Sequence, residues 1–409
     1  MTILVANVGS SSYKCRLLDM PSERDIAGAE VERVGSVDAV VTYRRGDAVL
    51  VDRQVEPVHD HAGAVLRVLN LLTDRATGVI ESAERLDGVG FKAVQAGPRN
   101  ASVLLDADVI AAMEEFAPLF PAHNPPYLAC IRFFRDRFPR IPLVGVFEPG
   151  FHNDIPEEAR IFGLPYEWYR DYHVRRYGFH GATFRYVTGE VIRRLGLDPA
   201  RARIIACHLG GSSSICAFGG GKSIDTSFSF TTQSGLLQTA RFGDVDPYAF
   251  LHVMRKKGIT FEQALEEAST RGGLLGISGV GKDMRDIKAA AAAGNARARL
   301  AIDKLVYDIV RHIGAYHVLL QGVDAIAFSG GMGTRDADLR ARVVDRIAFL
   351  GVDLDPKLNR DPAEGVKTRP GSKIAVVTVA TNEEVVVARE TARVLAAGGA
   401  ARWREFSGG

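Results

Sequence analysis

Apolar residues in the first 150 positions follow a strand pattern first and a mixture of helix and strand patterns afterwards. Short apolar runs flank a Gly-Ser turn in "ILVANVGSSSYKCRLL", which predicts a strand, a tight turn and a strand. "AVVTYRR" and "AVLVDRQV" predict further strands, and "HAGAVLRVLNLLTDRA", "ADVIAAMEEFA" and "YLACIRFFRDRF" have helical periodicity. "RIPLVGVFEPGFH" predicts a buried strand that ends in a turn. This order indicates an α/β layer with a boundary near residue 150.

The rest of the chain repeats this series at greater length. "RIIACHLGGSSSICAF" predicts a second strand, turn and strand, and "DPYAFLHVMRKKG", "FEQALEEAST" and "ARARLAIDKLVYDIVRHIGAYHVLL" predict helices. "DAIAFSGGMG" predicts a strand that runs into two glycines. "KIAVVTVATNEEVVVARETARVL" predicts a strand, a turn and a helix that begins near Asn382.

The Gly-Ser turn therefore occurs twice. Gly9-Ser10-Ser11-Ser12 and Gly211-Ser212-Ser213-Ser214 lie 202 residues apart. Small hydroxyl side chains leave main-chain N–H groups uncovered, so such a turn can bind an anion. Either copy alone could be an ordinary hairpin, but two copies indicate a duplicated domain with both turns facing one cleft.

Composition supports a globular protein that acts on small molecules. The 409 residues favour two domains, and they are 46% hydrophobic and 24% charged, with a mean hydropathy of +0.01. The net charge of +2 gives no reason to expect nucleic acid or an anionic membrane as a partner. The N-terminus lacks signal-peptide features and no apolar run reaches the length of a membrane span, so we expect a cytoplasmic protein.

The four cysteines show no paired metal-ligand spacing. We expect them to be buried, reduced and structural, with three of them on strands. They are Cys15, Cys130, Cys207 and Cys216.

Five charged or ionisable residues stand in positions that suit chemistry. Lys14 follows the first turn, Glu148 follows a strand, and His180, Arg241 and Glu384 lie in "RYGFHG", "TARFGD" and "TNEE". Each has an ordinary structural explanation when considered alone. Together they supply cations for phosphate, carboxylates for a metal and glycines for close backbone approach, a set of groups that suits phosphoryl transfer. No GxxxxGK[ST] loop and no protein-kinase signature set is present.

The chain resembles the acetate kinase family over nearly its whole length. The shared motifs occur in family order: "NVGSSSYK", "RRYGFHGAT", "HLGG", "GKSIDTS", "GLLGISG", "DMRDI", "FSGGMG" and "TNEE". The resemblance implies the superfamily of acetate and sugar kinases, actin and heat-shock chaperone ATPases, with duplicated actin-like (ribonuclease H-like) α/β domains and a cleft between them. It implies an N-terminal domain of residues 1–150 plus 386–409 and a C-terminal domain of residues 151–385.

The same resemblance implies where ATP or ADP binds. The first phosphate loop would use Asn7, Ser10, Ser12 and Lys14. The second would use His208, Leu209, Gly210 and Gly211. The adenosine site would use Asp283, Met284, Arg285, Gly330, Gly331 and Arg335.

The implied chemistry is reversible, in-line transfer of a phosphoryl group from ATP to a short carboxylic acid, which gives an acyl phosphate and ADP. Asn7 and Glu384 would lie near Mg²⁺ or Mn²⁺. His180 matches the histidine that holds the phosphoryl group in flight, and Arg241 matches an arginine that binds the carboxylate and that group. A loose transition state needs such cations and an in-line path more than a protein nucleophile.

Several positions depart from the family pattern. Lys92 in "FKAVQAG" stands for the second of the two arginines that bind the carboxylate and the phosphoryl group, from "HRVVHGG", and Glu148 in "FEPGFH" stands for the catalytic aspartate of "FDTAFH". The resemblance therefore implies that both are catalytic residues. Gly211 replaces the asparagine of "HLGNG", Arg335 the asparagine of "GGIGEN", and Phe184 the second histidine of "HGTSH". Lysine keeps the charge of arginine but loses its planar bidentate fork.

The family's small apolar acyl pocket is also altered. Val94 and Phe179 are retained, but Thr232 in "FTTQSG" replaces a proline. "FAPLFPAHNP" carries extra residues, so Ala122 stands at the leucine position. His123, the next residue, matches the histidine of the family's "HNP" stretch and is expected at the acid site. More room and an added hydroxyl predict an acid that is larger or more polar than acetate. Alternatively, the phenylalanine among the inserted residues refills the space and acetate remains the best substrate.

Two other functions fit the same fold. Water could replace the carboxylate in a phosphohydrolase, although the Arg241 and Lys92 cations are unnecessary for hydrolysis. A non-catalytic nucleotide-binding relative is the other alternative. The resemblance further implies a homodimer whose partners are the nucleotide and a small carboxylate.

Overall fold

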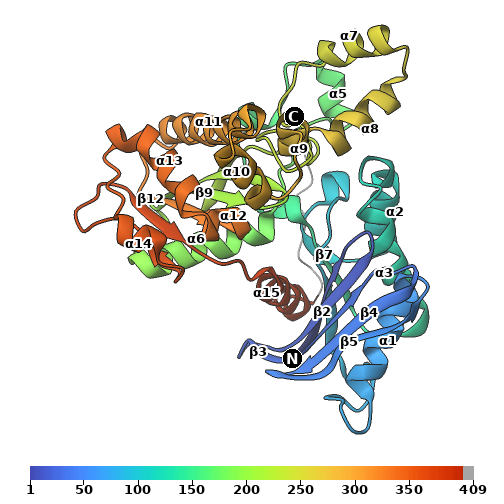
Figure 1. The fold of residues 1–409 in the computed structure, drawn as a ribbon. Helices are drawn as coiled ribbons and strands as arrows, with labels where there is room; N and C mark the ends of the chain where they lie inside the picture. Colours follow the sequence, from blue (N-terminus) through green and yellow to red (C-terminus); the bar gives the residue numbers. More distant parts are fainter. Residues whose placement is uncertain (399–409) are drawn as a thin grey trace. The chain divides into compact units, whose positions relative to one another are not determined.

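A computed structural model describes residues 1–398. Contacts within the chain group it into two units, shown in Figure 1. The first contains Met1–Gly150 and a C-terminal segment that joins it at Asn382, and the second contains Phe151–Thr381. The C-terminal segment thus enters the first unit at residue 382.

The first unit is built on an eight-stranded sheet with the order β5-β4-β3-β2-β1-β6-β8-β7. Its strands are β1 (Thr2–Val8), β2 (Ser12–Asp19), β3 (Arg24–Glu32), β4 (Ser36–Arg45), β5 (Ala48–Val58), β6 (Gly88–Phe91), β7 (Ser102–Leu104) and β8 (Leu143–Val146). Its helices are α1 (His61–Thr73), α2 (Ala107–Glu115), α3 (Asn124–Arg137) and α15 (Glu383–Ala396). Strands β1, β6 and β8 are parallel, so their carboxyl ends meet at one edge.

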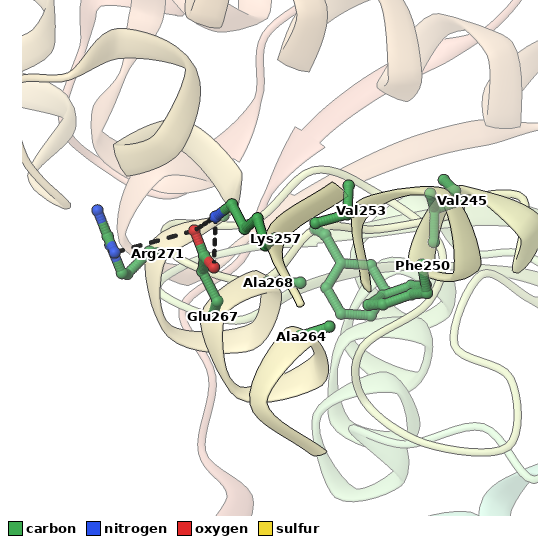
Figure 2. A pocket seen from close by; sticks show the side chains of 11 residues that line it. Val245, Phe250, Val253, Lys257, Ala264, Glu267, Ala268 and Arg271 are labelled. Atoms are coloured by element: carbon green, nitrogen blue, oxygen red, sulfur yellow. Dashed lines mark hydrogen bonds and ion pairs between the residues drawn. The ribbon is translucent and has the colours of Figure 1, made fainter. Parts of the chain in front are cut away.

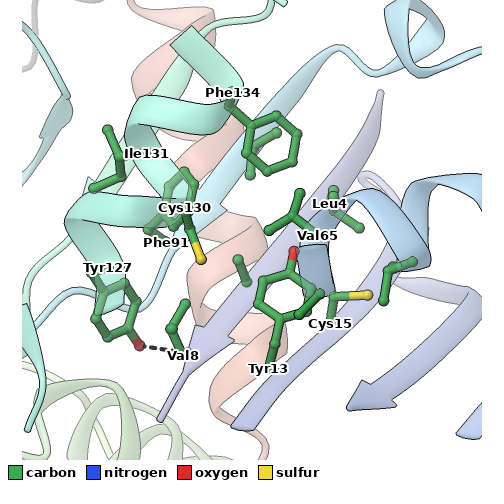
Figure 3. Packing of buried hydrophobic residues seen from close by; sticks show 14 of the residues in the cluster. Leu4, Val8, Tyr13, Cys15, Val65, Phe91, Tyr127, Cys130, Ile131 and Phe134 are labelled. Atoms are coloured by element: carbon green, nitrogen blue, oxygen red, sulfur yellow. Dashed lines mark hydrogen bonds between the residues drawn. The ribbon is translucent and has the colours of Figure 1, made fainter. Parts of the chain in front are cut away.

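Apolar side chains of β1 point alternately to the two faces of this sheet, and helices cover both faces. Leu4, Ala6 and Val8 belong to the large core that includes α1 and α3, whereas Ile3 and Val5 belong to the core that includes α15. Figure 3 shows the first of these cores, where aromatic rings of α3 and β6 pack beside Tyr13 of β2. The helices therefore form a layer on each face of the sheet.

The second unit is built on a six-stranded sheet with the order β11-β10-β9-β12-β14-β13. Its strands are β9 (Arg203–Leu209), β10 (Ser213–Gly219), β11 (Lys222–Thr226), β12 (Ala325–Ser329), β13 (Gly365–Val366) and β14 (Ala375–Thr378). Its main helices are α6 (Gly181–Leu195), α7 (Tyr248–Lys257), α8 (Phe261–Arg271), α9 (Gly273–Ser278), α10 (Met284–Ala292), α11 (Ala296–Leu319), α12 (Gly330–Arg335) and α13 (Ala337–Ile347). Shorter helices are α4 (Glu157–Arg160), α5 (Tyr166–Arg170) and α14 (Pro356–Arg360).

This sheet is also covered on both faces. Alternate residues of β9 pack against α11 and α13 on one side and against α6 on the other. Side chains cap the starts of two helices: Asn382 accepts a bond from Val385 N at the start of α15, where a helix was expected to begin, and Thr260 and Gln263 form a capping box on α8.

The two sheets repeat one plan. The series β3-β2-β1-β6-β8-β7 matches β11-β10-β9-β12-β14-β13 in order and in strand direction. The two hairpins differ in the length of their turns. Val8 pairs with Tyr13 whereas Leu209 pairs with Ser213, so the first turn is one residue longer than the second.

All four cysteines are free and buried, as expected, and three of them lie on strands. Among residues 1–398, each helix is too short or too polar to span a lipid bilayer.

Candidate active site

Backbone hydrogen bonds hold the first Gly-Ser turn. The carbonyl oxygen of Gly9 accepts from Nε2 of His61 at 2.9 Å, and that of Ser11 accepts from the N–H of Val34 at 2.9 Å. The N–H of Val8, just before the turn, donates to the Tyr127 hydroxyl at 3.1 Å (Figure 3). The Ser10 side chain is exposed, so this turn has a fixed backbone and an open surface.

Lys14, Asn7 and Glu384, which are expected near the phosphates and the metal, have different surroundings in the first unit. Lys14, opposite Asn7 in the β1–β2 ladder, places its Nζ 2.6 Å from Glu30 Oε1 on β3, so its charge is already paired. Asn7 lies two residues after Val5 on β1, so its side chain is on the same face of the sheet, the face that α15 covers. Glu384 lies in the first turn of α15, 3.9 Å from Arg16.

Lys92 forms a buried ion cluster at the carboxyl ends of β6 and β8. Its Nζ lies 2.8 Å from Glu383 Oε2 and 3.3 Å from Glu148 Oε1, and the Glu148 side chain is only 5% exposed. Burial by itself would lower the pKa of Lys92, but the Glu148 and Glu383 carboxylates outweigh burial and raise that pKa well above its usual range. Lys92 is therefore a permanent cation held by two carboxylates.

In the second unit, His152 fixes the backbone that leads into His180. Its Nε2–H donates to the carbonyl oxygen of Phe179 at 3.0 Å, which leaves Nδ1 to accept from the Ser223 hydroxyl at 2.8 Å. Gly178 has a φ of +76°, and a Cβ there would lie 2.6 Å from the His152 ring, so only glycine fits. Burial lowers the pKa of His152 to about 4, so the ring is neutral at physiological pH.

This neutral imidazole predicts a pH-dependent stability. Between pH 6.5 and 4 the unfolded chain takes up a proton at His152 that the folded chain does not, so His152 makes folding less favourable as the pH falls. The loss amounts to about 3 kcal/mol over that window. His152→Gln removes this component, so calorimetric melting temperatures should fall less steeply on acidification than in the wild type. The exposed-residue control His252→Gln should keep the wild-type slope, and an equal slope in His152→Gln would contradict the prediction.

His180 and His208 lie side by side, with ring centroids 4.6 Å apart. Nδ1 of His180 bonds the Ser214 hydroxyl at 2.8 Å, and Nδ1 of His208 bonds the Ser329 hydroxyl at 3.2 Å. His180 has φ 60° and ψ 30°, a left-handed conformation that is uncommon for a residue other than glycine. Such strain at the start of α6 is typical of a functional position.

Arg241 is a partly buried cation whose hydrogen-bond partners are neutral. Its Nη1 donates to Ser212 Oγ at 3.0 Å and to Gln238 Oε1 at 3.5 Å. Within the part of the chain that the structure describes, Arg241 forms no ion pair with a carboxylate. Burial lowers its pKa from the usual value, but an arginine remains charged. The charge is therefore available to an anion beside the second turn.

A cavity of about 710 Å³ lies in the second unit beside that turn. Seven of the expected nucleotide-site residues line it: Gly210, Gly211, Asp283, Met284, Arg285, Gly331 and Arg335. The sequence did not point to the other seven, which are Thr239, Lys282, Lys288, Met332, Asp336, Ala337 and Asp338.

Gly330 and Gly211 differ in whether the backbone has room for a side chain at that position. Gly330 has a φ of +74°, and a Cβ there would lie 2.6 Å from the Leu209 carbonyl oxygen, so the step from β12 into α12 needs glycine. A Cβ on Gly211 would meet nothing within 4 Å. The glycine in place of the family's asparagine therefore leaves open space.

The expected acid-binding residues are divided between the units. Val94, Ala122 and His123 belong to the first unit, where Ala122 is exposed and Phe120 of the inserted segment is buried. Phe179 and Thr232 belong to the second, where Phe179 is buried.

No group of three or more His, Cys, Asp or Glu side chains within residues 1–398 is arranged to hold a metal ion. Mg²⁺ bound in kinases usually has one or two protein oxygen ligands and takes the rest from phosphates and water. Asn7 and Glu384 supply oxygen atoms of the right kind, so this chain fits a metal that arrives with its nucleotide.

Another cavity, of about 410 Å³, lies between α7 and α8 (Figure 2). Its walls are mainly apolar, including Phe250 and Val253, and at one end Glu267 pairs with Lys257 and Arg271. None of the expected site residues lines it.

Comparison with known proteins shows the family. The model of the acetokinase family matches residues 2–389. The acetate kinase of Geobacillus sp. (strain WCH70) is 40% identical over 395 residues, which are 96% of this chain and 98% of that protein. The acetate kinase of Pseudothermotoga lettingae is 39% identical over 97% of this chain and 98% of its own.

Solved structures agree with this result. The crystal structure of Porphyromonas gingivalis acetate kinase matches with a TM-score of 0.87 and 36% identity, over 96% of this chain and 99% of that one. A propionate kinase from Francisella tularensis matches with a TM-score of 0.87 and 29% identity, over 96% and 99%. Together with the repeated strand order, these matches confirm the duplicated actin-like fold. The chain belongs to the acetokinase family, and it is a phosphotransferase with a carboxyl group as acceptor.

Proposed function

We propose that this enzyme transfers the γ-phosphoryl group of ATP, reversibly and in line, to a short-chain carboxylic acid to give an acyl phosphate and ADP. The observation that carries the nucleotide part is the cavity of about 710 Å³ in the second unit, because seven residues expected at a nucleotide site line it. The carboxylate part is supported by Arg241, whose charge has only neutral partners among the described residues.

In this proposal, each polar group has one task. The turns at Ser10 and Gly210 bind the nucleotide phosphates through main-chain N–H groups. His180 and Arg241 bind the equatorial oxygens of the phosphoryl group in the transition state, where negative charge is spread over three oxygens. Asn7 and Glu384 would hold the divalent metal, Mg²⁺ or Mn²⁺, which offsets phosphate charge when it is bound.

The test is a coupled assay of the purified chain with ATP, Mg²⁺, a carboxylate and hydroxylamine. Hydroxylamine traps an acyl phosphate as a hydroxamate, so hydroxamate formation that depends on ATP supports the proposal. Phosphate release without hydroxamate would instead indicate a phosphohydrolase, and ATP binding without either product would indicate a non-catalytic relative. Activity with pyrophosphate but with no nucleoside triphosphate would contradict the nucleotide donor.

We further propose that the preferred acid is larger or more polar than acetate. Ala122 is exposed, which supports extra room at the former leucine position. Propionate, butyrate or a hydroxy- or keto-substituted short acid should give a kcat/KM roughly tenfold above that of acetate, the usual effect of one methylene in a pocket. Ala122→Leu should shift the preference back toward acetate. A panel of short acids at saturating ATP in which acetate is best would show that the pocket is not enlarged.

The family resemblance also leads us to propose a homodimer in the cytoplasm. Sedimentation of the purified chain tests the first part of this proposal.

A further inference from the structure

Gln238 lies fully buried in the loop that carries Arg241, and its side-chain amide joins three segments of the second unit. Its Oε1 accepts from the Ser212 hydroxyl at 3.0 Å and from the Ser213 N–H at 3.4 Å, both in the second turn or directly after it. Its Nε2 donates to the carbonyl oxygen of Thr232 at 2.9 Å. One amide thus connects the second turn to the segment expected at the acid site.

The same oxygen also contacts Arg241. Arg241 Nη1 lies 3.0 Å from Ser212 Oγ and 3.5 Å from Gln238 Oε1, and Ser212 itself donates to Gln238. These three groups form a closed triangle of hydrogen bonds. The backbone tightens it, because the N–H of Gln238 donates to the carbonyl oxygen of Arg241 at 3.3 Å.

We propose that Gln238 is a positioning residue, which holds the Arg241 guanidinium against the second turn and leaves its positive charge free for the substrate carboxylate. The proposal rests on the proposed role of Arg241. A glutamine oxygen accepts hydrogen bonds as a carboxylate does, but it carries no formal charge and so does not compete with an anionic substrate. An apolar side chain of the same length would fill the space without fixing the guanidinium.

A double-mutant cycle tests whether Gln238 acts through Arg241. Q238M should lower kcat/KM for the best acid about tenfold, because a hydrogen bond to a charged group is lost. The same change in the R241A background should alter kcat/KM by less than about twofold, since the group that it positions is gone. An equal loss in both backgrounds would overturn the proposal, and so would an unchanged kcat/KM in Q238M.

Q238E separates positioning from a purely structural role. The introduced carboxylate keeps the shape of glutamine, pairs with Arg241 and no longer donates to the Thr232 carbonyl oxygen, so the KM for the acid should rise about tenfold while the KM for ATP stays within about twofold. Equal changes in both KM values would overturn the proposal. Thr188→Val, which removes another buried polar group of this unit outside the site, controls for lost stability.

The R241A variant distinguishes a failure of the proposed function from a failure of the inference about Gln238. If R241A alone kept full turnover, the role of Arg241 would be wrong and the inference about Gln238 would fall with it. If R241A lost turnover while Q238M did not, only the inference about Gln238 would be wrong.

Discussion

Arg241→Ala and His180→Ala should each lower kcat by about 100- to 1000-fold while the affinity for ATP is kept. Removing one preorganised charged contact to a developing negative charge costs roughly 3–4 kcal/mol in the transition state. Among the described residues, the hydrogen-bond partners of Arg241 are all neutral, so removing its side chain leaves no buried carboxylate unpaired. His180 lies in a strained backbone position beside His208, where its ring is held by Ser214.

Turnover and ATP binding must be measured separately for this prediction. Arg299→Ala, which removes an exposed arginine of the same unit, should leave both unchanged. Turnover near the wild-type value in either Arg241→Ala or His180→Ala would refute the assigned role. Loss of ATP affinity together with turnover would point to a disturbed fold instead.

Strong local patterns in the sequence predicted the elements that carry the two turns. Both hairpins form, and α15 is capped by Asn382 where a helix was expected to begin. Strand β3 and helix α6 were not expected. Helix α6 directly follows the left-handed His180, and no serine, threonine, aspartate or asparagine cap marks its start.

The repeat was recognisable in sequence, but its register was not. The two Gly-Ser stretches are identical over four residues, whereas the pairs Val8–Tyr13 and Leu209–Ser213 require turns of different length. A turn can gain one residue without disturbing the strands, because the surplus residue remains outside the ladder. Identity within a turn is therefore a poor guide to strand register.

The family motifs led to seven residues that line the cavity beside the second turn, but not to the groups that support the proposed site. Gln238 and Ser212 are 26 residues apart, and His61 and Gly9 are 52 apart, so no local pattern connects them. The motif "TNEE" contains two adjacent glutamates, and their different directions on helix α15 give them different partners. Glu383 contacts Lys92, whereas Glu384 lies near Arg16. Lys14, which is expected at the phosphates, also pairs with Glu30 on the next strand, a contact that no local pattern indicates.

Restoring the family residues at Lys92 and Glu148 one at a time should reduce activity more than restoring both. Lys92 Nζ lies 3.3 Å from Glu148 Oε1 in a buried cluster, so the length of each side chain is matched to the other. Lys92→Arg introduces a larger, planar head group against Glu148, and Glu148→Asp withdraws the carboxylate from Lys92. The double variant offsets one change with the other. Its loss in kcat/KM should be roughly tenfold smaller than the product of the single losses, because residues in contact couple by about 0.5–3 kcal/mol.

A control double-mutant cycle and a variant of Glu383 test whether the effect is specific to this ion cluster. The pair Arg132–Glu114 in the same unit is solvent-exposed, so Arg132→Lys, Glu114→Asp and their combination should leave kcat/KM unchanged and their small effects on melting temperature should add. Glu383→Gln leaves Lys92 with Glu148 as its remaining partner in this cluster, which should increase the coupling between them. Simple additivity of Lys92→Arg and Glu148→Asp would contradict the prediction, because two side chains that act as one ion cluster cannot be changed independently.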